Sequence, residues 1–290
     1  MARNRLVGVN RFSSTLSQLI QLFKQTSPPS TQQPYPKLRN FILDIMDEGR
    51  RKNIIHLLFD AEITPMQHNL AQHHAETGQR ISLTTYIAKS LACAIDEDRI
   101  MHAYRQGKSK LVLFDDIDLS VMIERDIEDG TLPVVHIVRA ANRKPIDDIH
   151  QELKAAKVAP LGENGPMSAL EKQFFELPSP LRKFVWFFIR RDPNLFKQLA
   201  GTVGITSLGM HASGKVVVIP ITPMTLTLSI GSIGKKLVME EGCPVEREVI
   251  QLNLSADHDI IDGSPLVRFT DRFRKKLENG CALDNPLCLN

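Results

Sequence analysis

Hydrophobic residues along the chain change their spacing several times, and each spacing predicts a different kind of element. Between residue 37 and about Gly49, apolar residues recur at helical spacing, namely Leu38, Phe41, Ile42, Ile45 and Met46. Similar periodicity predicts further helices, which lie over residues 64–78 with Thr64 as the N-cap, from Ser82 or Thr84 to about residue 95, over 145–157, and from Gly263 to Gly280.

Short apolar runs separate these helices and predict strands. They fill residues 54–63, 110–124, 132–138, 203–208, 215–220, 225–233 and 249–254. The run 110–124 is predicted to form a strand pair or hairpin. Because the strands cluster in the second half and are joined partly by turns and partly by helices, they predict a mixed sheet covered by helices. The fold class is α/β (α+β), without a regular βαβ winding.

The stretch 168–199 is helical in pattern, strongly apolar, and interrupted by three prolines. Its dense apolar residues favour a packed helical hairpin that covers the sheet. The alternatives are a lid, an acceptor-binding surface, and contact with a membrane surface through Arg182, Lys183, Arg190 and Arg191.

Composition and charge narrow the class of protein. With 42% hydrophobic and 24% charged residues among 290, the chain has an ordinary globular composition. A net charge of +3 without a dense Lys/Arg block argues against a nucleic-acid binder. Four scattered cysteines without a Cys-x-x-Cys pair predict neither a metal site nor a disulfide framework, and they favour a reducing, cytoplasmic location.

The N-terminal region has a composition of its own. Residues 1–43 contain no Asp or Glu, yet they carry six Lys or Arg residues. This predicts a basic arm over residues 1–36, partly disordered or helical, followed by one domain over residues 37–290. Organelle transit peptides share the acid-poor composition, so targeting to an organelle is the alternative location.

The motif that carries catalytic chemistry is HDIIDG at residues 258–263. It follows an apolar strand and precedes an amphipathic helix, so His258 is expected on a strand-to-helix loop, where catalytic residues concentrate. A neutral imidazole is suited to removing a proton near pH 7. The alternative is an ordinary histidine on a surface loop.

Residues 253–265 (NLSADHDIIDGSP) resemble the HxxxDG signature at the C-terminus of the acyltransferase catalytic domain of 2-oxo acid dehydrogenase complexes. That domain shares its fold with chloramphenicol acetyltransferase. The segments 201–210 (GTVGITSLGM), 115–121 (DDIDLSV) and 53–56 (NIIH) resemble other motifs of the same family in the same order. The resemblance covers about residues 37–280 and implies a two-layer sandwich of helices on a mixed sheet.

The resemblance also implies roles for single residues. His258 would be the general base, and Thr206 would match the family's hydroxyl residue that stabilises the oxyanion, with Ser207 as the fallback. Asp262 would organise the site by pairing with an arginine, for which Arg39 is the candidate. For Thr206 an ordinary strand position, and for Arg39 a solvated helix position, are the alternatives. Active sites of the family lie between the subunits of a trimer, so a homotrimer or larger assembly is implied.

These residues predict a coenzyme A-dependent acyltransferase. Acyl-CoA would be a substrate, the acceptor would be a hydroxyl, amine or thiol on a small molecule or carrier, and no cofactor would be tightly bound. The residues ahead of 37 are too few for a lipoyl domain, and the family's usual arginine after the catalytic histidine is Asp259 here. The first departure implies that acyl groups are not channelled on a lipoyl arm of this chain. Asp259, together with a helical segment 168–199 that is longer than the corresponding family linker, favours a non-lipoyl acceptor. The alternatives are a catalytically weak scaffold relative, and a detached core that acts on a lipoyl domain of another chain.

Overall fold

The computed structural model describes residues 30–33, 35, 38–127, 130–158, 174, 177–207 and 214–284. The chain divides into two compact units, Met1–Arg39 and Asn40–Asn290. The predicted arm over residues 1–36 lies almost entirely outside the described residues. Apart from the first two residues of helix α2, every element named below belongs to the second unit.

Most helices begin and end close to the predicted residues. The helices are α2 (Leu38–Gly49), α3 (Ile63–Thr77), α4 (Leu83–Asp96), the 3₁₀-helix η1 (Arg99–His102), α5 (Ile146–Val158), α7 (Ser179–Ile189), α8 (Pro193–Ala200), α9 (Gly263–Glu278) and α10 (Cys281–Asp284), of which η1 and α10 were not predicted. Ser82 caps α4 as predicted, because its Oγ accepts a hydrogen bond from the N–H of Thr85 at 3.2 Å. The prediction for Thr64 was wrong: α3 begins one residue earlier, and Glu62 occupies the cap position without a side-chain hydrogen bond.

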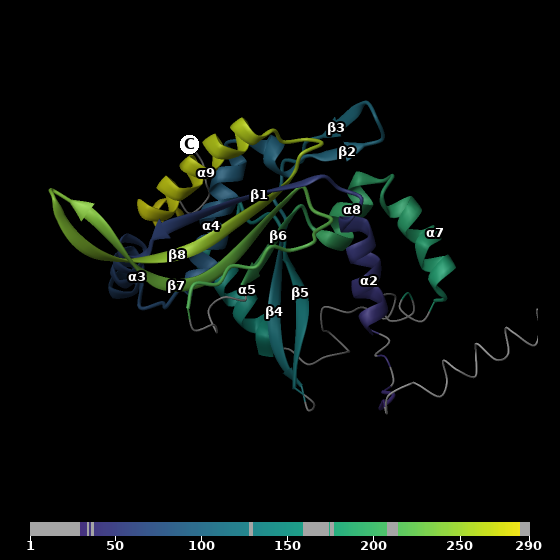
Figure 1. Cartoon of the computed structure of the whole chain (residues 1–290), viewed down its shortest axis with the longest axis horizontal. Helices are drawn as coiled ribbons and strands as arrows, with labels where there is room; N and C mark the ends of the chain where they lie inside the picture. Colours follow the sequence, from purple (N-terminus) through teal and green to yellow (C-terminus); the bar gives the residue numbers. More distant parts are fainter. Residues whose placement is uncertain are drawn as a thin grey trace, which may run out of the picture. The chain divides into compact units, whose positions relative to one another are not determined.

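Six strands form one mixed sheet, as predicted, in the order β1-β8-β7-β6-β4-β5 (Figure 1). Strand β6 runs parallel to its neighbours β4 and β7, and the other pairs are antiparallel. The strands are β1 (Ile54–Glu62), β4 (Leu119–Ile127), β5 (Gly130–Val138), β6 (Val203–Ser207), β7 (Leu226–Glu240) and β8 (Cys243–Asp257). A separate two-stranded hairpin consists of β2 (Tyr104–Gln106) and β3 (Lys110–Val112).

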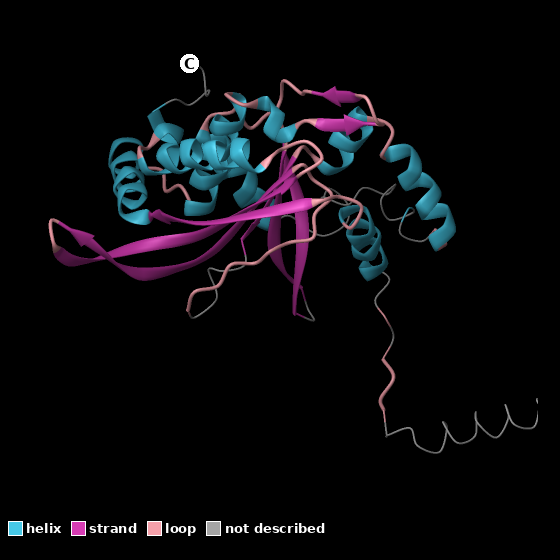
Figure 2. Ribbon diagram, turned by 45° about the horizontal axis from the view of Figure 1, so that its top comes forward, coloured by secondary structure: helices cyan, strands magenta, loops and turns pink. Residues whose placement is uncertain are grey.

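One face of the sheet is apolar and packs against the helices. Val121, Ile205, Leu228 and Leu254 are aligned across four neighbouring strands. They belong to one buried cluster with residues of α4 and α9, which include Leu91, Phe269 and Phe273. Figure 2 shows the resulting layer of helices along one side of the strands. This confirms the predicted two-layer arrangement.

The opposite face carries polar rows, because successive residues of a strand point to opposite sides. One row consists of Thr227 on β7, Ser255 on β8 and His56 on β1. The Nδ1 of His56 lies 2.9 Å from the Oγ of Ser255, and burial lowers the pKa of His56. The next row consists of Thr206, Ser229 and Asn253. The face that contains Thr206 is therefore the one turned away from the helical layer.

Residues 215–220 do not form the predicted strand. They run alongside β7 as irregular chain. The N–H of Val216 donates to the Oγ of Ser232, and the N–H of Ser232 donates to the carbonyl of Val216, each at 2.8 Å. Gly231 permits this approach, because a Cβ there would lie 2.5 Å from the carbonyl oxygen of Val216.

Strands β7 and β8 are longer than predicted, since they continue as a ribbon to Glu240 and back from Cys243. The two-residue turn consists of Glu241 (φ 49°) and Gly242 (φ 83°). Positive φ at both positions matches the twist of the flanking strands and closes the hairpin. Polar and apolar residues alternate irregularly along this ribbon, so the sequence shows no buried face that would reveal it.

Two further expectations concern the cysteines and the stretch 168–199. Cys93 on α4 is disulfide-bonded, so the expectation of no disulfide was wrong at this residue. Within 168–199, the described part contains α7 and most of α8, and residues 168–173, 175 and 176 lie outside the described chain. Among the described helices, none combines the length and the apolar composition that crossing a membrane requires.

Candidate active site

His258 lies in the turn between the end of β8 and the start of α9, as predicted. Its side chain is 45% exposed, and its Nδ1 lies 3.7 Å from the Oδ1 of Asp262. Its backbone N–H donates a 2.7 Å hydrogen bond to the carbonyl of Asn53, just before β1. The backbone of His258 is therefore fixed to the edge strand while the imidazole stays open to a substrate.

Asp262 occupies the N-cap position of α9. Its backbone carbonyl accepts a hydrogen bond from the N–H of Leu266, but its exposed carboxylate makes no side-chain capping bond. That leaves the carboxylate beside the His258 ring, in a position to orient it. Arg39 belongs to the other unit of the chain, so its pairing with Asp262 stays a prediction.

Asp259 is held between two segments that are distant in the sequence. Its Oδ1 accepts a hydrogen bond from the Nδ2 of Asn53 at 2.9 Å, and its Oδ2 pairs with the Nη1 of Arg105 at 2.5 Å. Arg105 lies on β2. The hairpin β2–β3 is thereby connected to the loop that carries His258.

Asp257 supports the same loop from beneath. Its almost fully buried carboxylate accepts a hydrogen bond from the Nζ of Lys52 at 2.6 Å and another from the N–H of Asp259 at 3.1 Å. Charge-assisted hydrogen bonds of this kind are about twice as strong as neutral ones. We call the set Lys52, Asn53, Arg105, Asp257 and Asp259 the loop clamp. Sequence reasoning did not find Lys52, Asn53 and Arg105 as members, because nothing in their local pattern connects them with residue 258.

Thr206 is buried on the polar face of the sheet, opposite Ser229 on β7. Its Oγ1 lies 4.0 Å from the sulfur of Met122. Ser207 follows directly and therefore points to the other side of the strand. Within the described part of the chain, the hydroxyls of Ser207 and Ser229 are buried without a hydrogen-bond partner. His211 lies outside the described residues.

The sheet register separates Thr206 from His258 within one chain. Thr206 is aligned with Ser229 on β7 and, through it, with Asn253 on β8. His258 follows five residues after Asn253, about 17 Å further along the ladder and two strands away. Thr206 lies near the C-terminal end of β6, whereas His258 lies beyond the N-terminal end of β6, on the far side of β7, so a single copy does not bring the two residues together.

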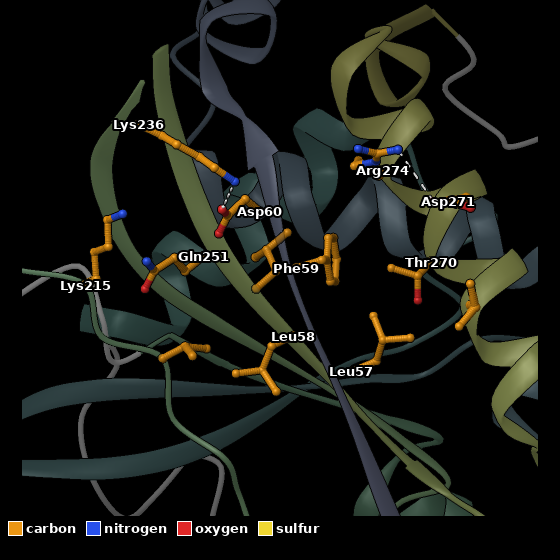
Figure 3. A pocket seen from close by; sticks show the side chains of 13 residues that line it. Leu57, Leu58, Phe59, Asp60, Lys215, Lys236, Gln251, Thr270, Asp271 and Arg274 are labelled. Carbon is orange, nitrogen blue, oxygen red and sulfur yellow. Dashed lines mark hydrogen bonds and ion pairs between the residues drawn. The ribbon is translucent and has the colours of Figure 1, made fainter. Parts of the chain in front are cut away.

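An open groove of about 620 Å³ lies elsewhere, between β1 and the second half of α9 (Figure 3). Four of its charged side chains form pairs, Lys236 with Asp60 at 2.8 Å and Arg274 with Asp271 at 3.6 Å, and Lys215 also lines the groove. Neither His258 nor Thr206 lines it. We therefore place the candidate chemistry at the His258 loop and give this groove no catalytic role.

A comparison with protein families gives one match that covers most of the chain. The model of the 2-oxoacid dehydrogenases acyltransferase (catalytic domain) matches residues 27–165 and 196–283. Both Thr206 and the His258 loop lie inside the matched residues. The segment 166–195, which contains α7, lies between the two matched stretches.

Curated relatives are similar over a shorter part of their own length. The dihydrolipoyllysine-residue acetyltransferase component of the pyruvate dehydrogenase complex of Rickettsia prowazekii is 23% identical over 200 residues, which covers 69% of this chain and 41% of the relative. Its counterpart from Rickettsia conorii is 24% identical over 200 residues, 69% of this chain and 40% of the relative. The chain thus spans about two-fifths of the length of the curated relatives it matches.

Solved structures share the fold. The cubic core of a pyruvate dehydrogenase multienzyme complex superposes with a TM-score of 0.63 at 16% identity, over 90% of this chain and 96% of that chain. A dihydrolipoamide acetyltransferase of Azotobacter vinelandii superposes with a TM-score of 0.64 at 16% identity, over 89% and 98%. At these identities the likeness shows the fold alone.

Proposed function

Because the chain belongs to the family of 2-oxoacid dehydrogenase acyltransferase catalytic domains, we propose that it transfers an acyl group from acyl-CoA to a hydroxyl, amine or thiol acceptor. The observation that carries the proposal is the placement of His258. It lies in the matched part of the chain, on a strand-to-helix loop fixed by the loop clamp, with its imidazole accessible.

In the proposed reaction, the neutral imidazole of His258 removes the proton of the acceptor as the acceptor attacks the thioester carbonyl. The tetrahedral intermediate places negative charge on the former carbonyl oxygen, and a hydroxyl donor stabilises it. The intermediate then collapses, the carbon–sulfur bond breaks, and the imidazolium donates its proton to the thiolate of CoA. Asp262, 3.7 Å from the ring, is positioned to orient it during these steps.

Thr206 is the proposed oxyanion donor. In the Azotobacter enzyme, the roles of a serine, a histidine and an asparagine four residues after it in the catalytic mechanism have been investigated. The spacing of His258 and Asp262 is the same. Ser207 remains the fallback, since its buried hydroxyl lacks a partner within the described residues.

The separation of Thr206 from His258 along the sheet supports an active site shared between copies. We therefore propose that His258 of one chain works with Thr206 of another, in a homotrimer or larger assembly. One similar solved structure is the cubic core of a multienzyme complex, which is an assembly of many chains.

The activity test follows the release of free CoA thiol from acetyl-CoA with a panel of hydroxyl, amine and thiol acceptors, including dihydrolipoamide and a separate lipoyl domain. The expected result is turnover with at least one acceptor and a loss of about 10²–10⁴-fold for His258→Ala. His68→Ala, which changes an exposed histidine on α3, is the matched control. If wild type and His258→Ala are equally inactive with every acceptor, the scaffold alternative replaces the proposal.

A mixing experiment tests the shared site. Thr206→Ala should lose about 10²–10³-fold by itself. When the His258→Ala and Thr206→Ala chains are co-expressed, random assembly restores about a quarter of the sites, because each site takes one residue from each of two chains. Activity that stays at the level of the single variants would place the complete site within one copy.

A further inference from the structure

Helix α7 belongs to a segment that the family model does not match. Residues 166–195 fall between the matched stretches 27–165 and 196–283. Membership in the family therefore does not explain why this helix is present.

The inner side of α7 is fixed to the rest of the domain. Arg182 is buried and donates from Nε to the carboxylate of Asp44 on α2 at 2.6 Å. Arg190 pairs with Glu48, also on α2, at 2.5 Å. Trp186 and Ile189 pack in a buried cluster with Phe196 of α8. Figure 1 shows α7 beside α8 and α2. Helices α7 and α8 thus form the predicted packed pair, but the prediction that it covers the sheet was wrong: among the described residues it packs on α2 and on Tyr104 of β2.

The outer side of α7 is apolar and exposed. Leu181, Phe184 and Phe188 are 51%, 61% and 50% exposed, and their spacing of three and four residues places them on one stripe of the helix. Phe187 lies next to them at 37% exposure, and the rings of Phe184 and Phe188 stand 4.9 Å apart. A helix with a second apolar stripe needs a second partner, since one stripe is already used against α2 and α8.

The charged residues of helix α7 itself have one sign, and the exposed Asp192 follows Arg191 beyond its end as the N-cap of α8. Helix α7 contains no acidic residue. Two of the four basic residues on or next to α7, Arg182 and Arg190, are already paired with acidic residues of α2. Lys183 is exposed, and the guanidinium of Arg191 lies 3.9 Å over the ring of Phe187. The outer side thus combines an aromatic stripe with two cations, Lys183 midway along the helix and Arg191 just beyond its C-terminal end.

We propose that the outer side of α7 rests on an anionic lipid surface. Helices that lie in a membrane interface combine an apolar stripe with flanking Lys and Arg residues, and each such cation near an anionic surface adds to binding. Eleven residues make a helix about 16 Å long, which suits a contact in the plane of the interface. A second copy fits less well, because an isologous contact would bring Lys183 and Arg191 against the same cations.

The test is flotation of the purified full chain with neutral phosphatidylcholine vesicles and with vesicles that contain phosphatidylglycerol. Wild type should float with the anionic vesicles and less with the neutral ones, and added salt should weaken the interaction. Phe184→Glu with Phe188→Glu should reduce binding by about tenfold or more, and Lys183→Glu should reduce it by a smaller factor.

Leu237→Glu with Met239→Glu is the matched control, because these residues are 72% and 69% exposed on the β7 ribbon. Binding of this control should equal that of wild type. Circular dichroism and light scattering check folding and assembly of every variant. The proposal is overturned if wild type does not float, or if the phenylalanine variant floats like wild type. A change of subunit number in that variant, without vesicle binding by wild type, would identify a second copy as the occupant. None of these readouts depends on acyl transfer.

Discussion

Breaking the ion pair between Arg105 and Asp259 should slow acyl transfer without unfolding the protein. Among the described residues, this is the only ion pair that joins a side chain of the β2–β3 hairpin to a side chain of the His258 loop. Two unit charges about 4 Å apart attract by about 1 kcal/mol in water and about 4 kcal/mol at an effective dielectric of 20. Because the two side chains are 41% and 33% exposed, the lower value applies, about 1 kcal/mol.

A free-energy change of about 1 kcal/mol alters the ratio of two loop conformations by about fivefold. We therefore expect Arg105→Ala and Asp259→Ala each to lower kcat by up to about fivefold, with little change in KM for acyl-CoA. The double variant should lose about as much as either single variant, since both remove the same pair. Reversal of the pair, Arg105→Asp with Asp259→Arg, should return kcat to within about twofold of wild type.

The assay is steady-state release of CoA thiol, with urea unfolding of each variant as a check of stability. Arg274→Ala is the control, because it removes an exposed ion pair with Asp271 on the far part of α9. Single variants with the kcat of wild type would refute the reasoning. So would a double variant whose loss equals the product of the two single losses, because the residues would then act independently.

Asp44→Ala should lower the free energy of unfolding by about 3–5 kcal/mol in urea, because it leaves the buried Arg182 unpaired, whereas Asp44→Leu with Arg182→Met should stay near wild type. Burial lowers the pKa of His102 to about 4, so the unfolded chain, whose histidine titrates near 6.5, binds more protons between these values. Stability should therefore fall by about 3 kcal/mol as the pH drops from 6.5 to 4, and His102→Asn should flatten this part of the unfolding profile. Gly231→Ala should cost about 1–3 kcal/mol in the same urea measurement, because its Cβ would meet the carbonyl of Val216.

Elements with strong local signals could be predicted from the sequence. Helix α4 has a capping Ser82 and apolar residues at helical spacing, and its interior is almost entirely buried. Residues 215–220 are equally apolar, yet their course depends on hydrogen bonds with Ser232 and on the space above Gly231. That information lies in another strand, so a local apolar run predicted a strand where the chain is irregular. The β7–β8 ribbon was underestimated for the related reason that it has no buried face.

The same distinction between local and distant information applies to the residues of the candidate site. His258 and Asp262 could be found because the motif, the strand before it and the helix after it are contiguous in the sequence. The residues that hold the loop could not. Lys52 and Asn53 reach it because β1 pairs with β8, and Arg105 reaches it from a hairpin outside the main sheet. The sheet order makes Lys52 and Asn53 neighbours of the loop, and the tertiary placement of a separate hairpin does so for Arg105.

Asp259 shows why a change of charge in a motif has to be interpreted together with its partner. By sequence alone, the acidic residue in place of the family's arginine suggests a different way of handling CoA or the acceptor. In the structure, its carboxylate is turned to Arg105 and Asn53, so its charge is compensated within the chain. An inverted charge that faced the substrate would have to be matched by a changed substrate. An inverted charge that pairs internally can instead leave the substrate unchanged and move the anchor of the loop to the β2–β3 hairpin. The charge-reversed pair separates these two cases, because it restores arginine at position 259 while it keeps the anchor.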